Sequence, residues 1–426
     1  MQKLKRELNL FDTTVAGIGI IIGAGVYAII GSSAGIVGNA IWLSFLIGGI
    51  VAGLTALSYA ELAGMFPKAG AEYVYTKNSF GNRMAFLVNW LLVVGTVFSI
   101  ATVSLGFAKY LNYFVEVPYW IAASSIIIIF TILNMYGIKE SVTIANIGGI
   151  IEIAGLLIVI FLGLPYIGNV DYFELPPDSH YSALFFGASL LFFAFLGFES
   201  IPRLAEETKN AENIIPKATL LSLGISTLIY LLVSIVAVSV VDWQVLANSD
   251  APLAEVASKA MGSNAGIILA LIALFATANT VLLMLITTTR LLYGLGEGGR
   301  ILRSLGEVSK KRRTPWIAAL ILGFFSLLAV LSEDISFVAY SADFSTFFTF
   351  ATINLALVWF RYTKPYSKRT FKVPDIFGVP LIPMFAAASC FLLATTSGVN
   401  VILIGLAITF IGFVTYEILK RMNLID

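Results

Sequence analysis

The sequence is poor in the residues that build metal sites, disulfides and most acid–base centres. Its 426 residues include one cysteine, Cys390, and one histidine, His180. A single cysteine excludes a disulfide framework and any Cys-based metal cluster within the chain. The lone histidine removes His-cluster metal sites, and we expect it in a solvated outer loop. We therefore predict no cofactor, no metal site and no enzymatic activity.

Charge is the second scarcity. Charged residues make up 12% of the chain, hydrophobic residues make up 58%, and the mean hydropathy is +0.92. A soluble domain has about a quarter charged residues and about half apolar residues. The composition therefore predicts a polytopic membrane protein in contact with a lipid bilayer, with no nucleic-acid partner.

Long apolar runs dominate what is present. A transmembrane helix needs about 20 apolar residues, and by that measure the chain is all-α, with twelve helices joined by polar or Pro-containing connections. The basic N-terminus runs directly into an apolar segment, so we expect an uncleaved first helix rather than a signal peptide. The predicted helices are residues 11–32, 39–65, 83–114, 118–136, 141–166, 181–206, 214–241, 263–296, 315–331, 336–361, 379–396 and 399–421.

Basic residues predict the orientation. With twelve spans, all of the 26 Lys and Arg residues except Lys109 and Lys259 fall on one side of the membrane. Cytoplasmic loops are the ones enriched in Lys and Arg. We therefore expect both termini in the cytoplasm and a location in the cell (plasma) membrane.

Two predicted helices are interrupted by glycine, one within residues 20–27 and one within residues 193–199. A helix break in a bilayer leaves backbone groups without partners, and it persists only where it lines a cavity. Breaks at corresponding positions of two halves are typical of secondary transporters. We expect one domain, 1–426, in which helices 1–5 (about 11–166) and helices 6–10 (about 181–361) have opposite topology, with helices 11–12 (about 379–421) appended.

The two breaks offer opposite poles to a ligand. The N–H groups of the segment Gly23-Ala24-Gly25 are expected to face a cavity at the positive end of a half-helix, which suits a carboxylate. The carbonyl groups of Phe193, Ala194 and Leu196 end another half-helix and can accept from an ammonium group. Together the poles fit a zwitterion, although glycines can also serve only as small packing residues in membrane helices.

Ionisable residues at membrane depth are candidates for function. Glu152 has no basic residue within a helical turn, which favours a proton-carrying role; it can also ligate sodium or be a hydrogen-bonded structural residue. Asn279 and Thr280 can contact Glu152 or form bonds across a helix interface. Glu199 can cap the second half of helix 6 or take part in ion coupling.

Three further ionisable residues are expected to have other roles. We predict that Asp343 and Lys109 lie at the outer membrane interface, where long side chains extend toward water. We predict a structural role for Glu61, near the inner end of helix 2.

The motifs at both breaks are similar to one family. Residues 19–27 (GIIIGAGVY), 67–75 (PKAGAEYVY), 192–199 (FFAFLGFE) and 290–294 (RLLYG) resemble signatures of the amino acid–polyamine–organocation (APC) superfamily. The resemblance implies the LeuT-like fold, a five-plus-five inverted repeat with broken helices 1 and 6. It also implies amino acids or related amines as substrates.

The resemblance implies site residues as well. Some proton-coupled relatives carry a lysine near the position of Glu152, so the carboxyl here departs from that pattern and leaves the coupling ion open. Phe195 and Phe198 would be aromatic gates. The implied substrate contacts are Ile21, Gly23, Ala24 and Gly25 from helix 1, Phe193, Leu196 and Gly197 from helix 6, and Met284 from helix 8.

These observations predict a secondary active amino acid transporter that works by alternating access, is coupled to protons through Glu152 and carries neutral amino acids. The alternatives are an exchanger of two substrates and a sodium-coupled symporter. A membrane-embedded enzyme would need paired catalytic groups near one membrane face, and this sequence does not offer them. A channel would need a continuous polar stripe, whereas the polar residues cluster at the two breaks.

Overall fold

The structure is a computed structural model that describes residues 7–66, 71–136, 141–297, 314–422 and 424, and within them it contains no β-strand. Its main helices are α1 (Leu10–Ile21), α2 (Gly25–Val37), α3 (Ile41–Met65), α4 (Ala71–Phe80), α5 (Asn82–Asn112), α6 (Tyr119–Tyr136), α7 (Ser141–Gly163), α8 (Ala183–Leu191), α9 (Ala211–Val240), α10 (Trp243–Asn248), α11 (Pro252–Met261), α12 (Ser263–Glu297), α13 (Trp316–Val330), α14 (Ile335–Thr363), α15 (Leu381–Thr395) and α16 (Val399–Arg421). Two 3₁₀ segments, η3 (Phe192–Phe195) and η4 (Phe198–Glu206), follow α8.

The described helices confirm the predicted number of spans. Nine described segments are long and apolar enough to cross a membrane. One of them, Gly25–Met65, contains both α2 and α3, and the shorter apolar helices α1, α13 and α15 complete the set. Since α1 and α2 together form the first span, these helices account for twelve spans.

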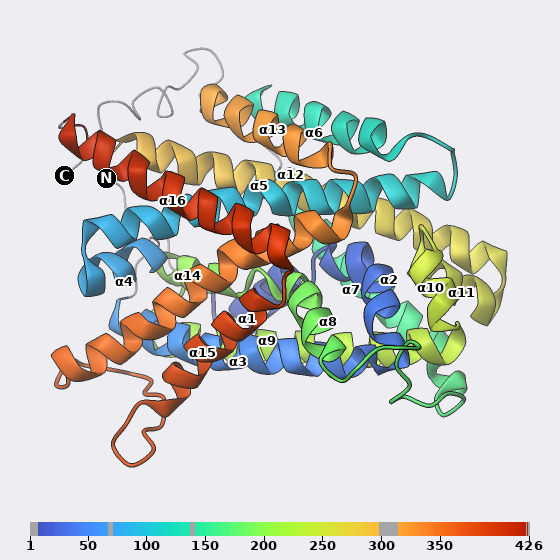
Figure 1. Ribbon diagram of the computed structural model, residues 1–426, viewed down its shortest axis with the longest axis horizontal. Coiled ribbons are helices and arrows are strands. Elements are labelled where there is room, and N and C mark those ends of the chain that lie inside the picture. The colour runs from blue at the N-terminus through green and yellow to red at the C-terminus, as the bar shows by residue number, and fades with distance from the viewer. Residues whose placement is uncertain (1–6, 67–70, 137–140, 298–313, 423, 425–426) are drawn as a thin grey trace.

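Three short helices were absent from the prediction: α4, α10 and α11. They have ten, six and ten residues, too few to cross a bilayer, and they lie in the connections between spans. A search for apolar runs of about 20 residues cannot find them. Figure 1 shows α4 at one end of the molecule, and α10 and α11 at the other.

Both predicted breaks are present. α1 ends at Ile21 and α2 begins at Gly25, so the first span is interrupted by three residues. In the sixth span, α8 tightens into η3, Leu196 adopts an extended ψ of 138°, and Gly197 has a φ of 122°. This φ lies in the region that favours glycine, so the residue type explains where the chain turns.

The helices pack as two groups around the breaks. α3 packs against α9 and α8, and α1 packs against α9. α5 packs against α12, α6, α13 and α14. The broken segments lie between these groups, near the centre of the molecule in Figure 1.

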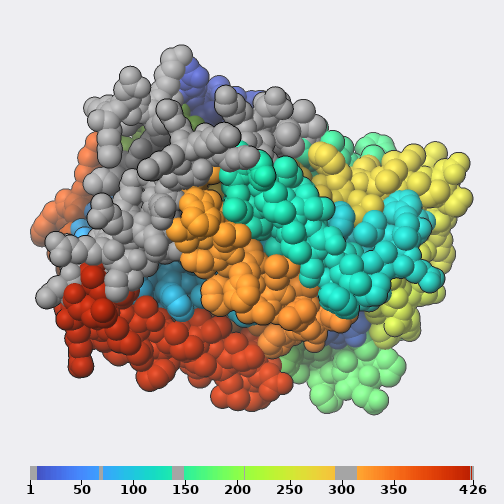
Figure 2. Space-filling model, turned by 90° about the horizontal axis from the view of Figure 1, so that it is seen from above, coloured from blue at the N-terminus to red at the C-terminus, as the bar shows by residue number. Residues whose placement is uncertain are grey.

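One outer face is formed by α6, α13 and α16, which are teal, orange and red in Figure 2. These helices carry exposed apolar side chains, as expected where a helix meets lipid rather than water. Examples are Ile128, Ile129, Ile132, Phe324, Phe325, Leu403, Leu406 and Phe410.

A buried ionic cluster joins α3 to the C-terminal end of α14. Glu61 is fully buried, and its Oε1 accepts a hydrogen bond from Nε of Arg369 at 2.8 Å. Its Oε2 accepts from the guanidinium of Arg361 and, at 2.8 Å, from the backbone N–H of Val373. Both arginine side chains are at most 7% exposed. The cluster agrees with the structural role predicted for Glu61.

We expect Glu61→Gln to destabilise the protein by about 3–5 kcal/mol, because it leaves two buried guanidinium groups without their shared carboxylate. Thermal unfolding of the purified protein in detergent measures the loss. The matched control is Glu212→Gln, which removes an exposed ion pair with Lys368 and should cost about 0–1 kcal/mol. Equal losses in the two variants would contradict a stabilising role for the cluster.

Candidate functional site

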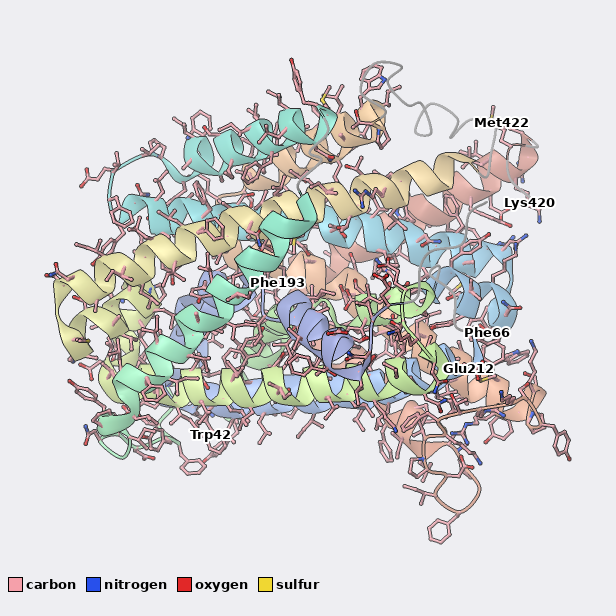
Figure 3. The ribbon with its side chains drawn as sticks, turned by 180° about the vertical axis from the view of Figure 1, so that it is seen from behind. Trp42, Phe66, Phe193, Glu212, Lys420 and Met422 are labelled. Atoms are coloured by element: carbon pink, nitrogen blue, oxygen red, sulfur yellow. The ribbon has the colours of Figure 1, made fainter. Side chains whose placement is uncertain are left out.

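The two helix breaks lie against each other. A Cβ placed on Gly25 would lie 2.9 Å from Cα of Ala194, and one placed on Gly197 would lie 2.7 Å from the carbonyl oxygen of Ile20. Real Cβ atoms do not approach backbone atoms so closely, so both positions require glycine in this conformation. Figure 3 shows Phe193, which precedes the second break, near the middle of the bundle. Helices 1 and 6 are therefore face to face at their interruptions.

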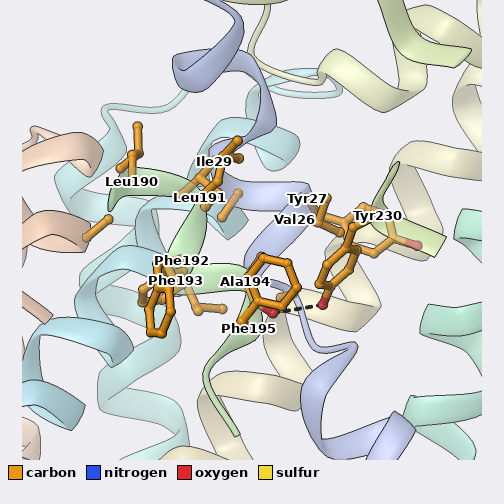
Figure 4. Close-up of a cluster of buried hydrophobic side chains, with 14 of the residues drawn as sticks. Val26, Tyr27, Ile29, Leu190, Leu191, Phe192, Phe193, Ala194, Phe195 and Tyr230 are labelled. Carbon is orange, nitrogen blue, oxygen red and sulfur yellow. Dashed lines mark hydrogen bonds between the residues drawn. The ribbon is translucent and has the colours of Figure 1, made fainter. Parts of the chain in front are cut away.

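Tyr230 of α9 joins the carbonyl ends of the two interrupted helices. Its buried hydroxyl lies 2.9 Å from the carbonyl oxygen of Ile21 and 2.8 Å from that of Ala194, the contact drawn in Figure 4. A phenol carries one proton, so it donates to one carbonyl at a time. The other carbonyl oxygen therefore keeps a lone pair for a second donor.

The N–H groups that follow the first break are already largely bonded. The N–H of Gly23 donates to the carbonyl of Ile21 at 2.9 Å, and the N–H of Ala24 donates to Oγ1 of Thr280 at 3.2 Å. The N–H of Gly25, the first residue of α2, has no acceptor among the described residues. The expectation that all three N–H groups face a free cavity is therefore wrong in this conformation, because a local turn and α12 take two of them.

Glu152 of α7 lies beside the first break and is 2% exposed. Its Oε1 is 3.4 Å from Nδ2 of Asn279 and 3.4 Å from Oγ1 of Thr280. These are long hydrogen bonds, and among the described residues no basic side chain forms an ion pair with Glu152. Since Thr280 also accepts from Ala24, its hydroxyl connects the carboxyl to the backbone of the break.

A contact that the sequence did not predict holds helix 1 to α7. The hydroxyl of Tyr27 donates to the backbone carbonyl of Glu152 at 2.8 Å. A Cβ on Gly155 would collide with this hydroxyl, and one on Gly148 would collide with Nδ2 of Asn279. Glycines on α7 therefore admit both polar side chains.

Glu199 lies just after the second break, in the first turn of η4. Its Oε2 accepts from the N–H of Gly197 at 2.7 Å. The carboxylate thus satisfies the N–H of Gly197, the residue that precedes η4, as the acidic side chain of a capping box does.

The other predicted contacts are spread around the breaks. The buried ring of Phe195 packs against Phe45 and Tyr230, and that of Phe198 packs against Tyr59 and Phe350. Both rings therefore contact helices other than α7, and the structure does not bring them to Glu152. The remaining predicted residues, Leu196 and Met284, are partly buried against the hydrophobic core.

The prediction that Asp343 lies at the membrane interface is wrong. Asp343 of α14 is fully buried, and the backbone of Phe193 lies close to its carboxyl. Helix 10 passes beside the break in helix 6, and for that reason this turn of α14 is covered by η3 rather than by lipid headgroups. A signal was available for both residues, because Tyr230 interrupts an apolar run and Asp343 is the single charged residue in the sequence from 335 to 360.

Comparison with known sequences agrees with this geometry. The sequence model described as amino acid permease matches residues 8–415. The chain belongs to the amino acid permease family. It is accordingly a multi-pass membrane protein with the LeuT-like fold, in which the interrupted helices 1 and 6 face each other.

Three relatives show the range of permeases to which the chain is similar. The branched-chain amino acid permease BcaP of Bacillus subtilis is 31% identical over 99% of this chain and 94% of its own length. The methylthioribose transporter of the same organism is 27% identical over 91% of this chain and 88% of its own length. The vacuolar cationic amino acid transporter 4 of Arabidopsis thaliana is 28% identical over 85% of this chain and 64% of its own length.

We expect Gly25→Ala to reduce uptake into proteoliposomes by at least about tenfold, because its Cβ would press on the backbone of Ala194 and push the breaks apart. Gly19→Ala is the matched control, since a Cβ at Gly19 meets nothing within 4 Å. It should leave uptake close to that of the unmodified protein. Comparable uptake by both variants would show that the close contact is dispensable.

We expect Tyr230→Phe to lower the stability of the substrate-free protein by about 1–3 kcal/mol, because the buried carbonyl of Ala194 loses this donor and that of Ile21 keeps only the N–H of Gly23. Added substrate, which supplies N–H donors, should then raise the unfolding temperature more than it does in the unmodified protein. Tyr59→Phe is the control, because its buried hydroxyl has no hydrogen-bond partner among the described residues. Identical behaviour of the two variants in a thermal-shift assay would contradict the bridging role.

Proposed function

We propose that this protein is a secondary active transporter of amino acids that works by alternating access and is driven by protons through Glu152. Neutral amino acids are the proposed substrates. The observation that carries the proposal is the connection from the carboxyl of Glu152, through the hydroxyl of Thr280, to the N–H of Ala24 at the first helix break.

The two poles of the break support an amino acid as the ligand. The free N–H of Gly25 starts a half-helix, where the helix dipole favours a carboxylate. The carbonyl groups of Ile21 and Ala194 share the single proton of Tyr230, so one of them can accept from an ammonium group. Both groups of one zwitterion can therefore be held between helices 1 and 6.

The surroundings of Glu152 support coupling to a proton. A carboxylate that is removed from water and lacks a basic partner is costly, whereas the protonated form is neutral. Protonation also weakens the hydrogen bond from Thr280, since an ionised Glu152 attracts the hydroxyl proton of Thr280 more strongly than a neutral Glu152 does. The proton on Glu152 can thus alter the backbone of the substrate site through one side chain.

The side chains at the breaks support a neutral substrate. Ile21, Phe193, Leu196 and Met284 are apolar, and the carboxylate of Glu199 is already bonded to Gly197. The 31% identical relative is named for branched-chain amino acids, which are neutral and apolar. The cationic amino acid transporter is more distant at 28% identity.

The topology completes the proposal. Helices 1–5 and helices 6–10 form two inverted repeats of one domain, with α15 and α16 added after them. The sorting of Lys and Arg supports cytoplasmic termini and a location in the plasma membrane. Opposite orientation of the two repeats gives two equivalent half-cycles, in which the site between helices 1 and 6 opens to either side.

We expect Glu152→Gln to abolish accumulation of a neutral amino acid driven by an inward proton gradient, because the amide cannot take up and release a proton. Counterflow of labelled substrate should persist, since it needs substrate binding and exchange but no net proton movement. Proteoliposome uptake with and without a pH gradient measures both. Glu116→Gln, an exposed residue between α5 and α6, is the matched control and should accumulate substrate normally.

Three outcomes would overturn parts of this proposal. Gradient-driven accumulation that survives in Glu152→Gln would exclude Glu152 as the coupling group. Uptake that depends on sodium and ignores the proton gradient would identify a sodium symporter. Counterflow without any gradient-driven accumulation in the unmodified protein would identify an exchanger.

A further inference from the structure

Asp343 presents a carboxyl that the fold leaves unsatisfied. Its side chain is 0% exposed, and although the backbone of Phe193 approaches it, neither carboxylate oxygen forms a hydrogen bond of ordinary geometry among the described residues. No Lys or Arg of the described chain forms an ion pair with it. An isolated carboxylate in such surroundings is strongly unfavourable, so the residue needs a ligand that neutralises its charge.

The position of Asp343 ties it to the break in helix 6. The backbone of Phe193 lies close to the carboxyl, and one turn later Phe347 packs against Phe192 with ring centroids 4.6 Å apart. α14 therefore lies directly on η3, the 3₁₀ segment that precedes the break. A change in the charge of Asp343 therefore alters the electrostatic surroundings of the backbone at the break in helix 6.

The arrangement mirrors that of Glu152. In the proposed inverted repeat, helix 5 (α7) corresponds to helix 10 (α14), and helix 1 corresponds to helix 6. Glu152 of helix 5 lies beside the break in helix 1, and Asp343 of helix 10 lies beside the break in helix 6. Each repeat thus places one buried carboxyl, without a basic partner, next to the broken helix of its own half.

Other titratable groups do not supply the missing charge. Tyr340, one turn earlier on α14, donates its hydroxyl proton to the carbonyl of Phe186. α8 and η3, which cover this part of α14, contain no titratable residue. The titratable residues on the other helices that pack against α14 have contacts elsewhere. On α2, α3 and α4 these contacts are Tyr27 with Glu152, Tyr59 with Tyr75, Glu61 with Arg361, Glu72 with Arg203, and Lys77 with Tyr73. On α5, α15 and α16 they are Arg83 with Glu417, Lys109 and Tyr110 in a small cavity with Asp250, Cys390 with Thr55, and Tyr416 with Phe86, while Lys420 and Arg421 end α16.

We propose that Asp343 is a second proton-binding site of the transporter, occupied while helices 1 and 6 are closed on each other. A proton forms an O–H bond with one carboxylate oxygen and needs no additional space in a packed core. When the break in helix 6 opens and water reaches α14, the proton leaves to water and the carboxylate becomes hydrated. Higher pH therefore disfavours the closed conformation. The inference rests on the proposed transport function, but the proton on Asp343 can be observed without transport.

Infrared difference spectroscopy of the purified protein tests the assignment directly. The C=O stretch of a protonated carboxyl is separate from that of a carboxylate, so substrate-free protein should show a protonated-acid band that Asp343→Asn lacks. Asp334→Asn is the matched control. Asp334 caps the same helix, where its carboxylate accepts from the N–H groups of Ser336 and Phe337, and its replacement should leave the band unchanged. An unchanged band in Asp343→Asn would overturn the proposal.

Counterflow at equal pH on both sides tests the functional consequence without a gradient. In the unmodified protein and in Asp334→Asn, counterflow should slow as pH rises, by up to about tenfold per pH unit where proton binding limits the closing step. Asp343→Asn, which mimics the protonated form, should show a shallower dependence. A pH profile of Asp343→Asn as steep as that of the unmodified protein would overturn the proposal. So would a loss of lysine binding but not of leucine binding in this variant, because Asp343 would then be a ligand of the substrate side chain.

Two safeguards keep the outcomes distinct. If Asp343→Asn is not recovered as a monodisperse protein, Asp343→Glu retains a titratable carboxyl and should shift the infrared band rather than remove it; an unshifted band would contradict the assignment. Failure of proton-driven uptake in the unmodified protein would contradict the proposed coupling through Glu152. It would leave the infrared result for Asp343 unaffected.

Discussion

The structure depends on how the backbone groups freed at two helix breaks are satisfied in a medium without water. Each unpaired N–H or C=O in a bilayer costs several kcal/mol, and two interrupted helices expose several such groups. Here they are met from the neighbouring helices and, in one case, from within the broken helix itself. Tyr230 of α9 serves the carbonyl ends of helices 1 and 6, Thr280 of α12 accepts from Ala24, and Glu199 accepts from Gly197.

Satisfying these groups from neighbouring helices makes the site responsive. The hydroxyl groups of Tyr230 and Thr280 each serve more than one partner, so a ligand that replaces one contact releases another. A buried carboxyl group lies beside each break: Glu152 of α7 beside the break in helix 1, and Asp343 of α14 beside the break in helix 6. Substrate, hydroxyl groups and carboxyl groups therefore form one connected set, in which movement of helix 1 or helix 6 changes the surroundings of all its members.

Much of this architecture could be predicted from the sequence because the bilayer imposes simple rules. Apolar length and the sorting of Lys and Arg predicted the twelve spans, and the segments around Gly23 and Gly197 predicted both breaks. The association of Glu152 with Asn279 and Thr280 was one of two alternatives. The partners at long sequence separation were not predictable: Tyr230 lies more than 200 residues from Ile21, and nothing local in the sequence pairs them.

The error over Asp343 has a physical explanation. Counting along α14 (Ile335–Thr363) places this residue near one end of the helix, where a charged side chain ordinarily reaches the membrane surface. That rule assumes that the helix end faces lipid. In this fold the same turn of α14 is covered by η3, so depth along the helix does not measure distance from water.

The length of α13 has a consequence for the membrane itself. With 15 residues it extends about 22 Å along its axis, and its neighbour α6, with 18 residues, extends about 27 Å. Both are shorter than a hydrocarbon core of about 30 Å. On the face that they share in Figure 2, this mismatch is met by local thinning of the bilayer, by flanking side chains that reach the interface, or by association with a second protein. Lipid chain length is therefore a variable that acts on this flank of the transporter from outside.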